Sequence, residues 1–379
     1  MAGIVYAWFY ALPQYIAGSD TWRFFELSKT ETGMLLKDPA GFITGLFQHG
    51  YNNSGNVFSG EGTYWNDLKS NVIIKLMAIC NVFTFKNYYA NIILFNFLFF
   101  FGPVAFYRVM SEIFAEKKIL MVATIFLLPS FLFWCSGLHK DGLIFTGLAL
   151  LIYHFNNQLK QKKIILKSVG IILACFLLIF ALRNVVCVLL LPAMVTWFLC
   201  NKYPSRILPV IAGVYVTCIL IFFLSMYIHP ALNFPQFAIE KQNEFKKLQG
   251  GSGINVRELH PTFISFAKFF PTAMDIALLR PHISEMRNTS YLPAVLELFL
   301  LWSLIGLFLF SKKYIPVNQP HKAIVIFCFC FAFTYLLLSG YTVTFSGAIV
   351  RYKSLVLPLI FCPLICMTNI NRDMIIKRS

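Results

Sequence analysis

Charged residues are scarce in this sequence, so those that border apolar segments are the first candidates for chemistry. Asp20 directly follows an apolar N-terminal segment, in Ser19-Asp20-Thr21. A carboxylate in that position can act as a general base that removes a proton from a hydroxyl group. Ser and Asp also cap helix N-termini, so a purely structural role for Asp20 is the alternative.

A second group consists of three consecutive residues, His139, Lys140 and Asp141, between two apolar segments. The spacing predicts a tight turn that brings these side chains to one end of the helices it connects. Lys140 can bind a phosphate group or form a structural ion pair with Asp141. The sequence leaves these two interpretations equally open.

Arginines supply the third set of candidates. Arg183 separates two apolar runs, Arg280 precedes Glu285, and Arg351-Tyr352 opens the last apolar segment. Arginine binds phosphate bidentately, so several cations on one side of a membrane suit a lipid phosphate or diphosphate headgroup. Snorkelling of single arginines to bulk lipid phosphates is the structural alternative.

Metal ligands are not apparent. The histidines have no zinc-like spacing, and the ten cysteines lie in apolar stretches, where they behave as small hydrophobic residues. Asp20 could contribute to a divalent-cation site, but no second ligand is identifiable, so the metal question stays open and no cofactor is assigned. The sequence contains no glycine-rich phosphate loop and no nucleotide-binding signature.

The composition predicts the fold class that must position these residues. Of 379 residues, 58% are hydrophobic and only 13% are charged, against roughly 25% in a typical soluble domain. Apolar runs long enough to cross a bilayer recur along the chain. We therefore expect an all-α, polytopic transmembrane helical bundle that forms one domain over 1–379. The net charge of +16 is ascribed to cytoplasmic loops and not to nucleic-acid binding.

The apolar runs and the charges of the short linkers predict a topology. About ten spans are expected, at 2–18, 88–107, 119–136, 143–157, 164–182, 184–200, 207–228, 292–311, 322–340 and 353–370. Basic residues dominate the linkers 108–118, 157–163, 201–206, 312–322 and 371–379. The positive-inside rule then places these linkers and both termini in the cytoplasm. Bacterial inner (plasma) membrane is the predicted location.

Two long outer loops follow from this topology, at about 19–71 and 229–291. The stretch 72–86 is apolar, but a span there would turn the later lysine-rich linkers outward. We therefore expect an interfacial or re-entrant helix in this region. Gln249-Gly250-Gly251-Ser252-Gly253 is predicted to form a mobile loop tip. Most acidic residues fall on the outer side, which places any acid–base chemistry there.

The arrangement resembles the GT-C superfamily of integral-membrane glycosyltransferases, especially its bacterial protein-mannosyltransferase-like branch. Asp20 matches the family's acidic residue after the first span, and the segment 72–86 matches its helices along the membrane. The family often has two adjacent acidic residues at that point, whereas Asp20 is followed by Thr21. The run ending in Lys140-Asp141 resembles a segment of membrane proteins from bacterial surface-polysaccharide clusters. A weaker resemblance is to O-antigen-type polysaccharide polymerases.

The resemblance implies a glycosyltransferase that uses a polyprenyl-phosphate-linked sugar at the outer face, in cell-surface glycan or polysaccharide assembly. Asp20 would be the catalytic base. The acceptor would be a glycan, a lipid or a protein, and membrane lipids would surround the bundle. A polymerase of lipid-linked repeat units and a polysaccharide or lipid transporter are the alternatives. Substrate-binding roles are expected for His139, Lys140, Asp141, Arg183, Arg280, Glu285, Arg351 and Tyr352.

Overall fold

All regular secondary structure in the described part of the chain is helical. The computed structural model describes residues 2–16, 18–48, 50–51, 55–58, 60, 62–161, 164–229, 232–248, 252–285, 291–310, 317 and 321–368. Strand-like pairing in these ranges is limited to isolated bridges, such as the one between Gly253 and Phe345. The predicted all-α class is therefore confirmed.

Within the described ranges, five helices are long and apolar enough to cross a membrane. They are α6 (Tyr88–Ile113), α10 (Leu166–Lys202), α11 (Ile207–Ile228), α14 (Leu292–Phe310) and α15 (Lys322–Thr342). Such a set is consistent with an integral membrane protein.

Two bent helix pairs raise the number of candidate spans to as many as seven. In the first, η1 and α7 (Ala115–Lys117 and Lys118–Phe126) precede α8 (Pro129–Cys135), with a bend of 54°. In the second, α16 (Ser346–Ser354) meets α17 (Leu357–Met367) at 61°. A residue that precedes a proline disfavours helical dihedrals. Leu128 precedes Pro129 and has an extended backbone, which explains the first break.

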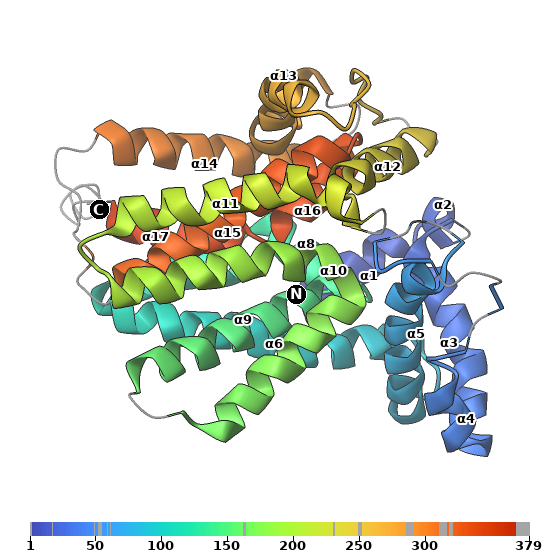
Figure 1. The fold of residues 1–379 in the computed structure, drawn as a ribbon. Coiled ribbons are helices and arrows are strands. Elements are labelled where there is room, and N and C mark those ends of the chain that lie inside the picture. The colour runs from blue at the N-terminus through green and yellow to red at the C-terminus, as the bar shows by residue number, and fades with distance from the viewer. Residues whose placement is uncertain are drawn as a thin grey trace.

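Helix α10 is a helical hairpin with Arg183 at its apex. The backbone of Arg183 is non-helical, with φ −158° and ψ 82°. The Cys187 thiol donates a hydrogen bond to the Phe176 carbonyl oxygen at 3.3 Å. In a straight helix these residues would lie about 16 Å apart along the axis. The two halves therefore fold back on each other, as Figure 1 shows, and the predicted break at Arg183 is confirmed.

The N-terminal segment differs from the single helix expected over 2–18. It forms two short helices, α1 (Ala2–Tyr10) and α2 (Pro13–Ile16). Pro13 ends the first helix because the residue before a proline avoids helical dihedrals. The nine residues of α1 reach about 14 Å, less than half of a hydrocarbon core.

At one end of the bundle, α3 (Asp20–Lys37) and α5 (Tyr64–Thr84) pair and run across the direction of the long helices (Figure 1). Helix α4 (Pro39–Thr44) follows α3. Buried polar groups join the pair, since Asn81 donates to the Ser28 and Thr32 hydroxyls at 2.8 and 3.1 Å. Helix α5 contains most of the segment 72–86, and its crosswise direction is that of a helix lying along a membrane.

The remaining elements complete the bundle around a large apolar core shared by α6, α10, α15, α17 and α9 (Lys140–Lys160). Between α11 and α14 lie α12 (Phe234–Lys247), α13 (Phe263–Met274), η3 (Asp275–Leu279) and η4 (Ile283–Glu285). Residues 249–251 of the predicted loop tip and the terminal segment 371–379 lie outside the described residues, whereas the other two loop-tip residues are held in place: Gly253 pairs with Phe345, and the Ser252 carbonyl oxygen accepts a hydrogen bond from the Ser346 amide at 3.0 Å.

Candidate functional site

The carboxylate of Asp141 is the centre of a buried charged cluster. Asp141 is the second residue of α9 and is fully buried. Arg183 donates from Nη2 to Oδ1 at 2.9 Å, and Arg351 donates from Nε to Oδ2 at 2.6 Å. The hairpin apex of α10 and the short helix α16 thus meet at the start of α9. Because two guanidinium groups share one carboxylate, these three residues together carry one positive charge.

Aromatic rings fix the two guanidinium groups of this cluster. Arg183 lies over the ring of Tyr352, 4.5 Å from its centroid, and donates from Nη1 to the Tyr335 hydroxyl at 2.9 Å. Arg351 lies over the ring of Trp134 at 5.3 Å. Such cation–π contacts add to the ion pairs. The arginines are therefore held in place before any ligand binds.

Arg351 keeps hydrogen-bonding capacity that the cluster does not use. Its Nε atom serves Asp141, whereas its two terminal nitrogens have no hydrogen bond to any residue in the described ranges. A guanidinium edge with two parallel N–H groups is the arrangement that binds phosphate bidentately. This edge is a ready anion-binding feature.

Two lysines near the cluster lack a counterion. Lys140 and Lys69 are both partly exposed, and neither has a hydrogen bond or ion pair within the part of the chain that the structure describes. Lys140 precedes the expected span 143–157, and Lys69 lies outside all of the expected spans. Burial lowers the pKa of Lys69 to about 8, and the positive charges of Lys241 and Arg183 add to the effect. Burial also lowers the pKa of Lys140 to about 7, with Arg183 and Arg351 contributing.

His139 connects the cluster to the N-terminal helix. Its ring is buried, its Nε2 atom lies 3.3 Å from the Tyr10 hydroxyl, and it packs edge-on against Tyr6. Asp20 is exposed in the first turn of α3, close enough to the Tyr10 hydroxyl to interact with it electrostatically. The neighbouring N-cap, Ser19, makes no side-chain capping bond. Asp20 thus lies at the edge of the site, and a carboxylate there also stabilises the N-terminus of α3.

Arg280 and Glu285 form a separate cluster. Arg280 donates from Nε to Asp275 at 3.0 Å and forms a short ion pair with Glu285 through Nη1. Glu285 also accepts a hydrogen bond from the Ser346 hydroxyl at 2.8 Å. His282 lies 3.0 Å from the second Asp275 oxygen. Because two carboxylates already neutralise Arg280, this residue is less suited to hold a phosphate than Arg351.

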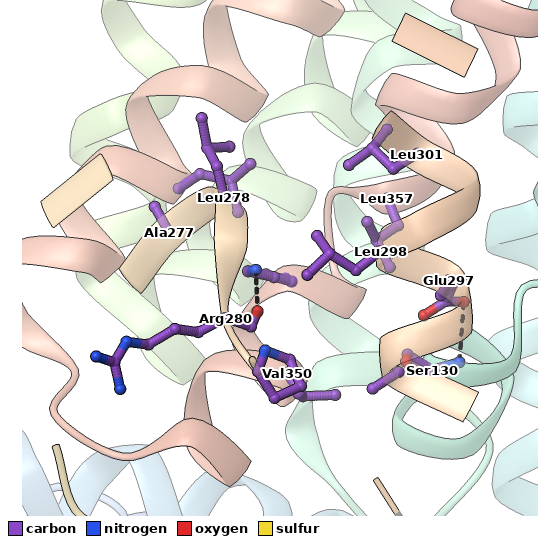
Figure 2. A pocket seen from close by; sticks show the side chains of 13 residues that line it. Ser130, Ala277, Leu278, Arg280, Glu297, Leu298, Leu301, Val350 and Leu357 are labelled. Carbon is purple, nitrogen blue, oxygen red and sulfur yellow. Dashed lines mark hydrogen bonds between the residues drawn. The ribbon is translucent and has the colours of Figure 1, made fainter. Parts of the chain in front are cut away.

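A small pocket lies next to the Arg280 cluster (Figure 2). Its volume is about 30 Å³, and its polar lining includes the buried side chains of Glu297 and Lys353. Glu297 accepts a hydrogen bond from the Ser130 amide at 3.1 Å, and Lys353 donates to the Arg280 carbonyl oxygen at 2.5 Å. The Arg280 guanidinium group points away from this pocket. The pocket has room for water but not for a sugar.

A larger, mostly apolar groove of about 770 Å³ lies between α1, α6, α7, α8 and the start of α9. Phenylalanine and isoleucine side chains dominate its lining, which also includes Asn96. Asn96 donates to the Ser136 carbonyl oxygen at 2.6 Å. At the turn between α8 and α9 the lining contains Ser136 and Gly142, and Gly142 directly follows Asp141. The groove therefore ends at the turn that carries the charged cluster, although its lining contains none of the cluster's charged side chains.

The structure sorts the predicted site residues into groups. One group converges on the Asp141 carboxylate and consists of Lys140, Asp141, Arg183, Arg351 and Tyr352, with His139 beside it. Arg280 and Glu285 belong to the second cluster, and Asp20 lies at the rim.

Sequence reasoning missed Lys69, Tyr335 and Trp134 as neighbours of this site. A tyrosine inside an apolar span, as at Tyr335, is a usable signal because a buried hydroxyl needs a partner. Lys69 lies in a stretch with no local motif, and only the packing of α5 on α10 brings it close.

No three His, Cys, Asp or Glu side chains within the described ranges lie together in a way that could hold a metal ion. Comparisons of the chain with protein-family models, with curated proteins and with solved structures find no match.

Proposed function

We propose that this chain is a membrane glycosyltransferase that takes a sugar from a polyprenyl-phosphate-linked donor at the outer face. The observation that carries the proposal is the fixed Arg351 guanidinium group beside Lys140; among the described residues, the terminal nitrogens of Arg351 have no hydrogen-bond partner and Lys140 has no counterion. The resemblance of the sequence to GT-C enzymes agrees with it. Both termini would be cytoplasmic, and about ten membrane passages would include α9 and both halves of α10.

The groove supports a lipid-linked donor. Its apolar lining suits an isoprenoid chain, because apolar surface removed from water contributes about 25 cal/mol per Å². The groove reaches the turn that precedes Asp141, so a chain lying in it would present its phosphate near Lys140 and Arg351. A soluble nucleotide-sugar would make no use of such a groove.

The chemistry assigned to the site is transfer of a glycosyl group from phosphate to a hydroxyl. The bond between the anomeric carbon and the phosphate oxygen breaks, and negative charge develops on the departing phosphate. Arg351 and Lys140 would stabilise that charge, and Arg183 would hold Asp141 and thereby Arg351 in position. Asp20 would accept the proton of the acceptor hydroxyl.

The test is a surface-glycan assay in cells that lack this protein. Wild-type chain should restore the glycan, whereas Arg351→Gln and Asp20→Asn should not. Lys247→Met, at an exposed position near the end of α12, should restore it fully. An unchanged glycan in the deletion strain would rule out the enzymatic proposal. Rescue by Asp20→Asn alone would remove only the assignment of the base.

A polymerase of lipid-linked repeat units is the second candidate, because it would use the same cations and the same groove. Product length separates the two activities. A transferase adds one sugar to each acceptor, whereas a polymerase gives a ladder of repeat units.

A further inference from the structure

Positive charge exceeds negative charge at the Asp141 cluster even after its ion pairs are counted. Arg183 and Arg351 share the single Asp141 carboxylate, whereas Lys140 and Lys69 have no counterion in the described ranges. When both lysines are protonated, four cationic side chains and one carboxylate leave three positive charges. Charges that are partly removed from water are costly unless they are paired, so this excess calls for an anionic ligand.

The helix packing places Lys69 on the side of α5 that faces the cluster. The Trp65 ring contacts the Phe180 ring edge-on, with centroids 6.4 Å apart, one turn before the α10 apex at Arg183. Lys69 follows Trp65 by four residues, so both lie on the same face of α5. Lys69 and Lys140 therefore approach Arg183 from different helices, α5 and α9.

The other charged residues around Lys69 do not offset the excess. Lys241 and Glu244 of α12 form a short ion pair with each other and are neutral as a pair. Asp67, two residues before Lys69, accepts a short hydrogen bond from the Tyr51 hydroxyl. Residues two apart on a helix face different directions, so Asp67 does not share the Lys69 face.

We propose that the lipid bound at this site is a diphosphate and not a monophosphate, with one phosphate on Arg351 and Lys140 and the other on Lys69. The inference rests on the proposed function, because it names the headgroup of the same donor. A sugar-linked lipid monophosphate is a diester with one negative charge, whereas the corresponding diphosphate carries two. The excess of three positive charges is matched better by the diphosphate.

The side chains of Arg351 and Lys69 differ in a way that suits the binding of two phosphates. A guanidinium edge that Asp141 holds rigid fixes one phosphate bidentately, whereas an ammonium group on a flexible stem follows a second phosphate that moves. After transfer, the departing lipid diphosphate gains a further negative charge, and Lys69 would hold that charge until the product leaves. A monophosphate donor would leave Lys69 without a role.

The experiment measures binding of three probes to the purified full-length chain in detergent: farnesyl diphosphate, farnesyl phosphate and inorganic diphosphate. Wild type should bind farnesyl diphosphate at least about tenfold more tightly than either other probe. Lys69→Met should lose most of this preference while it binds farnesyl phosphate as wild type does. Lys69→Arg should keep the preference, and Lys247→Met is the matched control. A single symmetric peak in gel filtration shows that each variant is folded.

The outcomes separate the two proposals. Equal affinity for farnesyl diphosphate and farnesyl phosphate, or an unchanged preference in Lys69→Met, would overturn the diphosphate assignment and leave the lipid-phosphate site standing. Absence of binding to both farnesyl probes would overturn the proposed donor class itself. Inorganic diphosphate that binds as tightly as farnesyl diphosphate would overturn the lipid source of the ligand.

Discussion

At the scale of single residues, the buried Asp141 carboxylate organises the whole cationic site. It is the only ion-pair partner of Arg183 and of Arg351 among the described residues. Burial of a carboxylate is costly, and here two charge-assisted hydrogen bonds offset that cost. The same contacts hold the Arg351 edge in a fixed orientation. Asp141 therefore has a structural role and a positioning role at once.

Replacing Asp141 tests the structural role. Asp141→Asn leaves two half-buried guanidinium groups without a counterion, and we expect a loss of about 3 kcal/mol of stability. The measurement is the thermal unfolding midpoint of the purified protein in detergent. Glu26→Gln is the control, because Glu26 is paired with Lys29 at the exposed surface of α3, where such pairs contribute little. An equal, small shift in both variants would contradict the central role of Asp141.

The pH dependence of anion binding follows from the lowered pKa of Lys69. An anion binds the protonated lysine, so the affinity is greatest below a pH of about 8 and falls as the pH rises above it. Between pH 8 and pH 9 this one group should weaken binding about fivefold. Lys140, whose pKa is about 7, adds a similar loss from a lower pH, whereas Arg183 and Arg351 stay charged.

The measurement is the affinity for farnesyl diphosphate at several pH values in wild type and in Lys69→Arg. Arginine stays protonated over this range, so the variant should lose less affinity than wild type between pH 8 and pH 9. The probe's own ionisation is the same in both proteins and cancels in the comparison. Parallel curves for the two proteins would show that Lys69 does not contact the anion.

The residue types of the site could be predicted from the sequence, but their pairing could not. Ionisable residues at the ends of apolar segments are rare and costly, which is why Lys140, Asp141, Arg183 and Arg351 stood out. Nothing in the local sequence shows that Arg280 is neutralised by Asp275 and Glu285. Both partners are only five residues from Arg280, so these ion pairs depend on the local turn between η3 and η4, whereas the position of Lys69 depends on the long-range packing of α5 on α10.

At the scale of secondary structure, close helix contacts in the core depend on small residues. Gly102 in the middle of α6 faces α9, where an added Cβ atom would lie 2.8 Å from the backbone of Thr146. Such an approach is tighter than a side chain allows, so the glycine permits the two helices to pack closely. Gly306 in α14 has nothing within 4 Å of the equivalent position.

A matched pair of substitutions tests this contact. Gly102→Val should force α6 and α9 apart and destabilise the protein by about 1–3 kcal/mol. Gly306→Val should have little effect, because its side chain would enter open space. Thermal unfolding in detergent gives both values. A large effect at Gly306 would mean that another surface covers α14.

The breaks between helices were predictable to different degrees. A charged residue between two apolar runs revealed the α10 hairpin, because an unbroken helix would bury Arg183 in the middle of a span. The break of the N-terminal segment at Pro13 was missed, although a proline gives a local reason for it. The segment is apolar throughout, and hydropathy alone does not separate one helix from two.

At the scale of the whole molecule, the proposed site requires that its residues share one side of the membrane. The crosswise helices α3 and α5 lie at the end of the bundle that also holds the α10 apex. Lys160 and Lys202 are the last residues of α9 and α10, at the ends of those helices opposite to the charged site. This arrangement agrees with the predicted separation of the charged site from the basic linkers.

Labelling of single introduced cysteines tests this sidedness. In a background with the ten native cysteines replaced, an impermeant maleimide should label Lys69→Cys and Ser19→Cys from outside intact cells. Lys160→Cys and Lys202→Cys should react only after permeabilisation. Labelling of Lys69→Cys and Lys160→Cys from the same side would mean that α9 does not cross the membrane.

Two side-chain contacts attach helix α16 to its neighbours, one to the Asp141 cluster and one to the Arg280 cluster. Its Arg351 is tied to Asp141, and its Ser346 is tied to Glu285 of the second cluster. An anion that attracts Arg351 would displace α16 slightly, and the Ser346 hydrogen bond would transmit this displacement to Glu285. We therefore expect anion binding at the site to change the hydrogen exchange of the segment 280–285. There, hydrogen–deuterium exchange should slow when farnesyl diphosphate is added to wild type, and the response should weaken in Ser346→Ala.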